Sequence, residues 1–344
     1  MIFQNTIVQF VSFFIPNREL RHKFRARYKR KTRYRKLRDE NMQLKNEIER
    51  LKAQCRSMRN EYKTLNYKYA LPEQRPQMLK DWYLERTGQK LNLDNPRTFN
   101  EKIQWLKLYD NDNIKTRLAD KFAVRDWVKE KIGEQYLIPL LGVYDAPEEI
   151  DWDGLPSEFV IKCNHGFGWN IIVKDKNQIN ENEVKDKLKR WLNTTFGFSG
   201  FELQYINIPP KIVIEKKMEN EGHDDLFDYK FYCFAGNPLY IQFMLDRFKD
   251  EVKVATYNTN WELQPFAYNH PMAEKSVDRP DNLELMLDLA KKLSAGFKFV
   301  RVDFYRLNDG TIYFGEMTFT PDAGQGRWYG QDMGLQFGDL IKLR

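Results

Sequence analysis

The stretch 299–321, FVRVDFYRLNDGTIYFGEMTFTP, constrains the fold of this chain more than any other part of its sequence. Apolar and polar side chains alternate over residues 299–305, an Asn-Asp-Gly sequence follows at 308–310, and the apolar pattern resumes at Ile312. Alternation with a period of two is typical of a β-strand, and Asp-Gly is a frequent hairpin turn. The stretch therefore predicts two antiparallel strands joined by a tight turn.

Three charged residues of this predicted hairpin share one face of the sheet. Arg301 and Asp303 have the same parity on the first strand, and Glu316 follows Asp303 by thirteen positions across the turn. A sheet face that is partly buried accepts such charges when they pair with one another or hold an ion. Two carboxylates facing each other suit Mg²⁺ together with substrate phosphates. The alternative is a solvated hairpin face with an ordinary ion pair.

Composition indicates a folded protein in a reducing compartment. Apolar residues make up 42% and aromatic residues 15% of the 344 residues, which argues for a packed core. The three cysteines, Cys55, Cys163 and Cys233, are odd in number and far apart, so no disulfide or zinc spacing is evident. We expect a cytoplasmic protein.

Basic charge is concentrated near the N-terminus. Residues 18–38 contain twelve Lys or Arg and one acid, and their net charge of +11 exceeds the +7 of the whole chain. The remainder is therefore net negative, which gives no reason to expect nucleic-acid binding by the globular part. Residues 1–15 are apolar but shorter than the roughly 20 residues of a membrane span, and the basic run follows them, unlike in a secretory signal.

Residues 1–36 are thus predicted to attach peripherally to an anionic membrane, at its inner face, through an apolar segment beside a polybasic one. The basic run could instead bind a polyanionic polymer, or form a mobile tail.

Residues 37–70 show a heptad repeat that predicts a coiled coil. The two series of positions spaced by seven are Leu37, Leu44, Leu51, Met58 and Leu65, and Asn41, Ile48, Cys55, Tyr62 and Tyr69. Such a repeat favours self-association, and Asn41 in the seam would fix the register. The predicted partner is a second copy of the chain; the alternative is one long helix packed on its own domain.

The rest of the chain divides into a helical lead-in region, 71–150, and a larger α+β domain, 151–344. Apolar residues recur at helical spacing over 72–151, and Thr98 with Glu101 has the pattern of a capping box at a helix start.

Residues 159–174, FVIKCNHGFGWNIIVK, predict a glycine-containing hairpin that could bind phosphate. Lys162 lies on the first strand, Gly166 and Gly168 lie in the turn, and a second strand follows. Backbone N–H groups of such a turn can fold over a phosphate, with Lys162 as the point charge. His165 is a candidate phosphate donor. The alternatives are an ordinary tight turn and a solvated histidine, and no Walker sequence occurs.

Two later segments complete the candidate site. Residues 211–217, KIVIEKK, predict a strand whose charged end suits an adenine pocket. Lys230 and Arg247 lie on two predicted strands around Gly236-Asn237-Pro238, where they could contact phosphate or an anionic substrate.

Together, the sequences at 162–176, 228–238 and 299–321 resemble those of the TupA-like ATP-grasp family, which is associated with bacterial cell-surface polysaccharide synthesis. The resemblance runs from about residue 75 to the C-terminus. It implies an α+β ATP-grasp fold, in which two α+β subdomains clasp ATP, after a helical region and an N-terminal coiled coil.

The hairpin is also similar to that of D-alanine:D-alanine ligases, and the resemblance implies residue roles. Arg301 and Lys230 would be catalytic, and Asp303, Glu316 and Thr318 would hold Mg²⁺. The nucleotide would contact Lys162, His165, Gly166, Gly168, Glu215, Lys216, Met218 and Lys230. Thr318 stands where many members have Asn, and Asp322 stands where a glycine is more usual.

The family reaction would phosphorylate a carboxylate with ATP and let an amine displace the phosphate to form an amide. We therefore hypothesise a ligase that joins an amino acid or similar amine to a carboxylated unit of a surface glycan. The alternatives are a glycosyltransferase or sugar kinase of the same pathway and a catalytically silent scaffold. An Asp-x-Asp string at a strand end would favour the glycosyltransferase or sugar kinase. The strings at 110–112 and 151–153 lie outside predicted strand ends.

Overall fold

The structure, a computed structural model, describes residues 18–198, 200–220, 226–245 and 252–343. The apolar segment 1–15 and the candidate substrate residue Arg247 lie outside the described residues. The chain forms two units, residues 1–65 and 66–344, which are considered separately.

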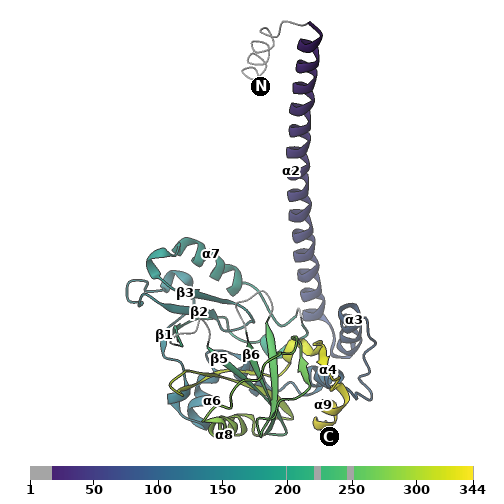
Figure 1. Ribbon diagram of the computed structural model, residues 1–344. Coiled ribbons are helices and arrows are strands. Elements are labelled where there is room, and N and C mark those ends of the chain that lie inside the picture. Colours follow the sequence, from purple (N-terminus) through teal and green to yellow (C-terminus); the bar gives the residue numbers. More distant parts are fainter. Residues whose placement is uncertain (1–17, 199, 221–225, 246–251, 344) are drawn as a thin grey trace. The chain divides into compact units, whose positions relative to one another are not determined.

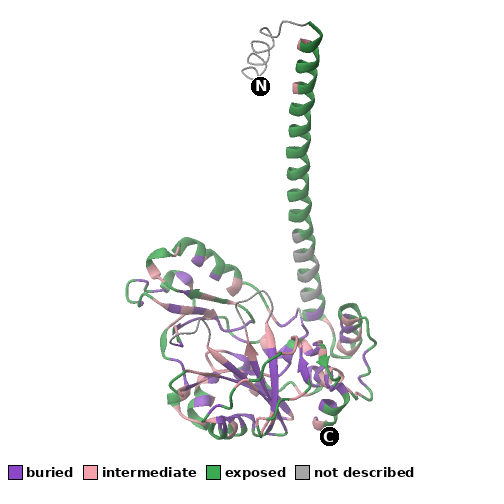
Figure 2. Ribbon diagram, in the orientation of Figure 1, coloured by how far each residue is buried: buried purple, intermediate pink, exposed green. Residues whose placement is uncertain are grey.

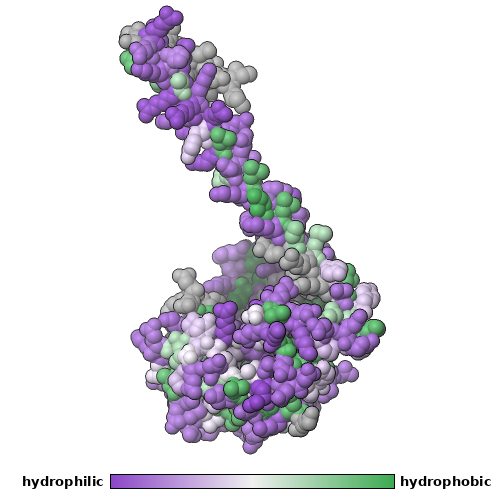
Figure 3. Space-filling view, turned by 90° about the vertical axis from the view of Figure 1, so that its right-hand side faces the viewer, coloured by the Kyte–Doolittle hydropathy of each residue, from purple (hydrophilic) through white to green (hydrophobic). Residues whose placement is uncertain are grey.

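One long helix, α2 (Arg18–Tyr69), provides the described part of the first unit. It includes both the basic run and the heptad repeat, so the predicted helix is confirmed and begins earlier than residue 37. The apolar heptad side chains Leu37, Leu44, Ile48 and Leu51 are exposed, and Figures 2 and 3 show exposed and hydrophobic residues along it. Their pairing with a second chain remains a prediction. Among the described helices, none is both long and apolar enough to cross a membrane.

The first part of the second unit is helical (Figure 1). Its helices are α3 (Arg75–Thr87), α4 (Phe99–Tyr109), α5 (Asn113–Ala119) and α6 (Val124–Lys131). The capping box of α4 is confirmed, since Glu101 N–H donates to Thr98 Oγ1 and Thr98 N–H donates to Glu101 Oε2. The predicted helical region ends at Lys131 and not near residue 150, because Leu140–Tyr144 forms a strand that pairs with a later part of the chain.

The first sheet has four antiparallel strands in the order β1-β4-β2-β3. They are β1 (Leu140–Tyr144), β2 (Phe159–Cys163), β3 (Asn170–Val173) and β4 (Ile212–Lys216). The apolar side of helix α7 (Glu181–Leu192) packs on this sheet through Val184 and Leu188. The predicted hairpin at 159–174 is confirmed.

The second sheet has five antiparallel strands in the order β10-β9-β5-β6-β7. They are β5 (Phe227–Phe234), β6 (Asn237–Leu245), β7 (Lys253–Asn258), β9 (Phe299–Arg306) and β10 (Ile312–Thr318). Helices α6 and α8 (Leu283–Ser294) share one hydrophobic core with a face of this sheet. The predicted C-terminal hairpin is thus confirmed as β9 and β10.

The opposite face of this sheet changes from aromatic to charged along its strands. At one end, Phe299 packs against Phe99 of α4, with ring centroids 5.2 Å apart, and Phe99 packs against Phe337 of α9 (Gly334–Leu340). Further along β9, the next residues of the same parity are Arg301 and Asp303.

A two-stranded sheet and short 3₁₀ turns complete the unit. The sheet pairs β8 (Phe266–Tyr268) with β11 (Trp328–Gly330). The turns are Pro72–Gln74, Glu134–Tyr136, Pro147–Glu149, Lys176–Gln178, Leu203–Tyr205 and Pro321–Gly324.

Candidate functional site

A cavity of about 540 Å³ is lined by residues of both larger sheets and of the segment around α6. Of the residues predicted from the sequence, the structure brings together at this cavity Lys162, Gly168, Glu215, Lys230, Arg301, Asp303, Glu316 and Thr318. It does not place His165, Gly166, Lys216 or Met218 on the lining. The cavity is the candidate site.

A β-bulge aims the second carboxylate into the cavity. Strand β10 pairs Phe314 with Phe304 and then Glu316 with Asp303, which leaves Gly315 as an extra residue. The bulge changes the parity of the strand, so Phe314 and Met317 both belong to the buried core, and Glu316 between them lines the cavity. A Cβ at Gly315 would lie 3.0 Å from the Asp303 carbonyl oxygen, so glycine suits this close approach.

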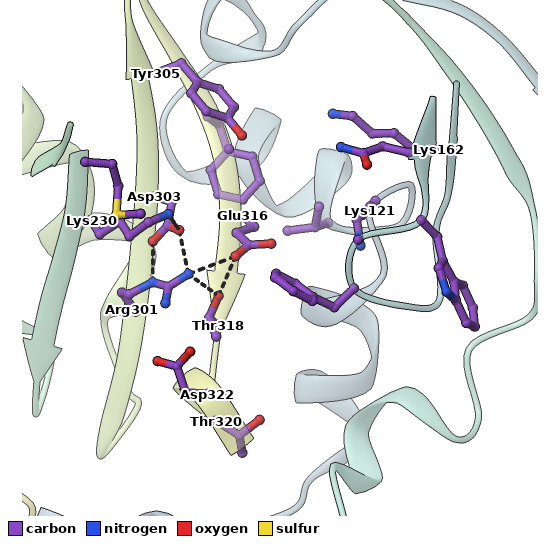
Figure 4. Close-up of a pocket in the computed structure, with 18 of the residues that line it drawn as sticks. Lys121, Lys162, Lys230, Arg301, Asp303, Tyr305, Glu316, Thr318, Thr320 and Asp322 are labelled. Carbon is purple, nitrogen blue, oxygen red and sulfur yellow. Dashed lines mark hydrogen bonds and ion pairs between the residues drawn. The ribbon is translucent and has the colours of Figure 1, made fainter. Parts of the chain in front are cut away.

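Arg301 connects the two carboxylates (Figure 4). Its Nε and Nη2 donate to the two oxygens of Asp303 at 2.7 Å each, and Nη2 also donates to Glu316 Oε1 at 2.9 Å. Thr318 Oγ1 accepts from Arg301 Nη2 at 3.2 Å and donates to Glu316 Oε1 at 2.9 Å. The three charges predicted to share a face therefore do so, and they form one hydrogen-bonded group.

Lys230, on the neighbouring strand β5, adds a second cation to Asp303. Its Nζ lies 2.7 Å from Asp303 Oδ2 and 2.9 Å from Asp228 Oδ2. Burial acts to lower the pKa of Lys230, but the two carboxylates outweigh burial and raise that pKa to about 12. Burial likewise acts to raise the pKa of Asp303, and Arg301 with Lys230 lowers it overall. Lys230 and Asp303 are therefore both charged at neutral pH.

The first sheet supplies a further ion-paired group. Lys162 Nζ lies 2.6 Å from Glu215 Oε2, and Arg125 of α6 donates to Glu215 Oε1 at 3.2 Å. Burial opposes the charge of Lys162, but Glu215 and its other acidic neighbours raise the pKa of Lys162 overall. Lys162 therefore stays positively charged at the cavity.

The glycine turn between β2 and β3 has two differently placed glycines. Gly168 lines the cavity with φ +71°, and open space surrounds the position of a Cβ there. Gly166 packs under the ring of Trp169, where a Cβ would come within 2.4 Å. His165 is buried between Asn164 and the carbonyl of Trp191, at 3.3 and 3.2 Å, and burial lowers the pKa of His165. Its ring serves packing in this structure.

Lys121 is a cavity residue that the sequence did not point to. It lies just before α6, lines the cavity, and donates from Nζ to the carbonyl of Gly166 in the glycine turn. Burial lowers the pKa of Lys121, against the opposing effect of Glu316. No local pattern around Asp120-Lys121 distinguishes it from a surface lysine, since its partners lie more than 40 positions away.

A strained turn forms the end of the cavity next to Thr318 (Figure 4). In the turn Pro321–Gly324, both Asp322 and Ala323 have φ +50°, a left-handed conformation that costs roughly 1–2 kcal/mol for a residue other than glycine. This conformation explains why a glycine would suit position 322. Strained backbone of this kind persists when its surroundings hold it, and it is concentrated at functional sites.

One face of α4 holds this turn in place. Gln104 Nε2 donates to the carbonyls of Ala323 and Gly324 at 2.9 and 2.7 Å, and Lys107 Nζ donates to Ala323 O at 2.6 Å. Asn100 Nδ2 donates to Gly326 O at 2.9 Å. Positions 100, 104 and 107 face the same way on a helix, and two of the three side chains are fully buried.

The donor set at the hairpin fits Mg²⁺. Asp303 and Glu316 face each other in register, and Thr318 adds a hydroxyl, so the ligands are all oxygens. Within the described ranges, no three acidic, histidine or cysteine side chains come close enough to form a metal cluster. An ion at this place would therefore use two carboxylates and share its remaining positions with phosphate oxygens and water.

Comparison with known proteins assigns the fold. The sequence profile of the TupA-like ATP-grasp family matches residues 101–342, which is more than half of the chain. The chain belongs to the TupA-like ATP-grasp family. The expected α+β ATP-grasp fold is thereby confirmed, and the two sheets with the cavity between them are its two clasping parts. No curated protein matches the sequence significantly.

Solved structures with a similar arrangement include several ATP-grasp proteins. D-alanine–D-alanine ligase from Bacillus anthracis complexed with ATP has 16% identity and a TM-score of 0.35, over 65% of this chain and 57% of that chain. The L-amino acid ligase from Bacillus licheniformis has 14% identity and a TM-score of 0.40, over 65% and 49%. This chain thus spans little more than half of the D-alanine–D-alanine ligase, and the assignment rests on the family match.

Proposed function

We propose that this TupA-like ATP-grasp protein is an ATP-dependent carboxylate–amine ligase that forms an amide through an acyl phosphate. The observation that carries the proposal is the cavity, which Lys121, Lys162 and Lys230 line together with two facing carboxylates bridged by Arg301. Cations around hard-oxygen ligands are the parts that phosphoryl transfer requires. Two of the similar structures are named as ligases, the D-alanine–D-alanine ligase and the L-amino acid ligase.

The residues have distinct proposed roles. Lys162, Lys121 and Gly168 bind the nucleotide phosphates, and Arg301 with Lys230 faces the transferring phosphoryl group. Mg²⁺, when held by Asp303, Glu316 and Thr318, supplies further neutralisation of phosphate charge. Because Arg301 and Lys230 already bind Asp303, either cation can exchange that contact for a phosphate oxygen.

The bonds in the two proposed steps balance without a further reactant. A carboxylate oxygen attacks the γ-phosphorus, and the bond to ADP breaks. The amine nitrogen then attacks the acyl carbon, inorganic phosphate leaves with the original carboxylate oxygen, and the amine proton passes to solvent or a nearby base. The adenine site remains proposed near Glu215, Lys216 and Met218, of which Glu215 lines the cavity.

We further propose a carboxylated unit of a cell-surface polysaccharide as one substrate and an amino acid or similar amine as the other. The exposed heptad side chains of α2 support self-association, and the basic residues before them support attachment to the anionic inner face of the cell membrane. Neither Asp-x-Asp string lines this cavity, so the two strings lend no support there to the glycosyltransferase alternative.

The proposal is tested by incubating the purified chain with ATP, amino acids and uronic-acid acceptors, and weighing the products. We expect a product whose mass corresponds to loss of water between acceptor and amine, with ADP release abolished in Glu316→Gln. Glu284→Gln, an exposed carboxylate on α8, is the matched control and should keep full turnover. Unchanged turnover in Glu316→Gln would refute the site assignment.

A further inference from the structure

A second cavity, of about 590 Å³, adjoins the candidate site. Asp322 is the residue that lines both cavities, so the strained turn forms the boundary between them. The second cavity lies within the roughly 300–1,000 Å³ of small-molecule sites. Tyr83, Arg86, Gln89 and other lining residues precede residue 101, where the family match begins. The second cavity is therefore built partly by the helical lead-in region.

The boundary between the cavities is held firmly. The hydrogen bonds from Asn100, Gln104 and Lys107 fix the carbonyls of residues 323, 324 and 326. Asn269, which also lines the second cavity, donates from Nδ2 to the carboxylate of Asp322. A ligand in the second cavity would therefore meet a preorganised wall whose other side faces Arg301 and the hairpin.

Two guanidinium groups of the second cavity can bind an anionic ligand, next to two carboxylates of opposite charge. Its two carboxylates already accept hydrogen bonds, Asp322 from Asn269 and Asp332 from the Gly334 amide. Its two guanidinium groups, Arg86 and Arg327, are exposed and make no ion pair within the part of the chain that the structure describes. Guanidinium groups without a protein partner are suited to carboxylate or phosphate, which they bind through two parallel donors.

The remaining lining suits a sugar. Side-chain amides also line the cavity, including those of Gln89 and Gln325. The half-buried ring of Trp328 adds a flat apolar surface. Hydrogen-bonding groups beside an aromatic ring fit a polyhydroxylated ring better than an apolar ligand.

We propose that the second cavity binds an acidic sugar unit of the glycan substrate, with Arg86 and Arg327 recognising its carboxylate. This inference rests on the proposed function, because the group that reacts must lie across Asp322, in the first cavity. A neighbouring unit of the same glycan would reach the first cavity past the boundary. Recognition of the substrate is thus separate from the residues that bind ATP.

Calorimetry with the full chain tests this inference, using trigalacturonate as the acidic probe and maltotriose as the neutral one. We expect saturable trigalacturonate binding, at least tenfold tighter than that of maltotriose. Arg86→Ala and Arg327→Ala should each weaken it about tenfold, whereas Arg97→Ala, an exposed arginine outside the cavity, should not. Mg-ADP binding should be unchanged in all three variants, which also shows that they are folded.

Three outcomes would overturn the inference: no saturable trigalacturonate binding, equal affinity in every variant, or complete competition by inorganic phosphate at an affinity equal to that of the sugar acid. If wild-type protein binds Mg-ADP but not trigalacturonate, the second cavity is misassigned while the proposed function stands. If it fails to bind Mg-ADP, the proposed function itself is wrong.

Discussion

Replacing Asp303 by asparagine tests the charge network at the hairpin. Asp303 is 2% exposed, and its two oxygens accept three charged hydrogen bonds of 2.7 Å from Arg301 and Lys230. Asparagine keeps the size but offers one oxygen, and its amide nitrogen must face a cation. Losing hydrogen bonds to charged groups costs about 1.5–3 kcal/mol each, and breaking a buried pair costs about 3–5 kcal/mol.

Two remaining partners reduce this loss. Glu316 still pairs with Arg301, and Asp228 still pairs with Lys230. We therefore expect Asp303→Asn to lower the free energy of unfolding by about 2–4 kcal/mol.

Urea unfolding followed by circular dichroism measures this difference, with an unchanged dependence on urea concentration as the sign of an intact fold. Asp309→Asn is the matched control, because Asp309 lies in the exposed turn of the same hairpin and accepts one hydrogen bond from the Thr311 amide. Its effect should be much smaller. If Asp303→Asn is no more destabilising than Asp309→Asn, the charge network does not stabilise the hairpin.

The same variant has a predicted pH dependence. Because Arg301 and Lys230, against burial, depress the pKa of Asp303 in the folded state, its charge stabilises the fold above the unfolded-state pKa. That stability is lost as the pH falls through the folded-state pKa. The difference in unfolding free energy between wild type and Asp303→Asn should thus be constant from pH 8 to 5 and shrink below about pH 4. A difference that is equally large at pH 3 would contradict this origin.

Three further predictions concern other parts of the chain. Lys121→Met should weaken Mg-ADP binding at least tenfold in calorimetry, whereas unchanged affinity would remove Lys121 from the proposed phosphate site. Gly168→Ala should lower nucleotide affinity, because φ +71° strains a residue with a Cβ by roughly 1–2 kcal/mol, and wild-type affinity would show that the turn needs no glycine there. The double variant Leu44→Lys, Leu51→Lys should convert an oligomer to a monomer in sedimentation; an unaltered mass would exclude the heptad seam as the interface.

The hairpin was predictable because its information is local. Alternation indicates two strands and Asn-Asp-Gly a turn between them, so Asp303 and Glu316 could be placed on paired strands. The bulge is what brings Glu316, instead of Gly315, opposite Asp303. Sequence reasoning missed the bulge at Gly315, although the break in parity between Phe314 and Met317 is its signal. Lys162 and Lys230 were candidates from the predicted strands that carry them, whereas Thr318 was found only through resemblance to a family.

The residues that sequence reasoning missed depend on contacts between distant segments. Gln104 and Lys107 are two of several polar positions on α4, and their partners in the turn at 321–324 lie more than 200 positions later. Lys121 meets the glycine turn only because β2 and α6 come together in the folded chain. Strand β1 falls within the region that the sequence predicts to be helical, because its pairing with β4 joins segments that are about 70 residues apart.

The most direct test of the proposed ligase follows the oxygen atoms of the carboxylate. The wild-type chain is incubated with ATP, an amino-acid mixture and trigalacturonate labelled with ¹⁸O in its carboxyl groups, and the released phosphate is analysed by mass spectrometry. Formation of an acyl phosphate predicts one ¹⁸O atom in each phosphate released with an amide product. Phosphate that carries no label, or phosphate transferred to the sugar without release, would contradict carboxylate activation by this site.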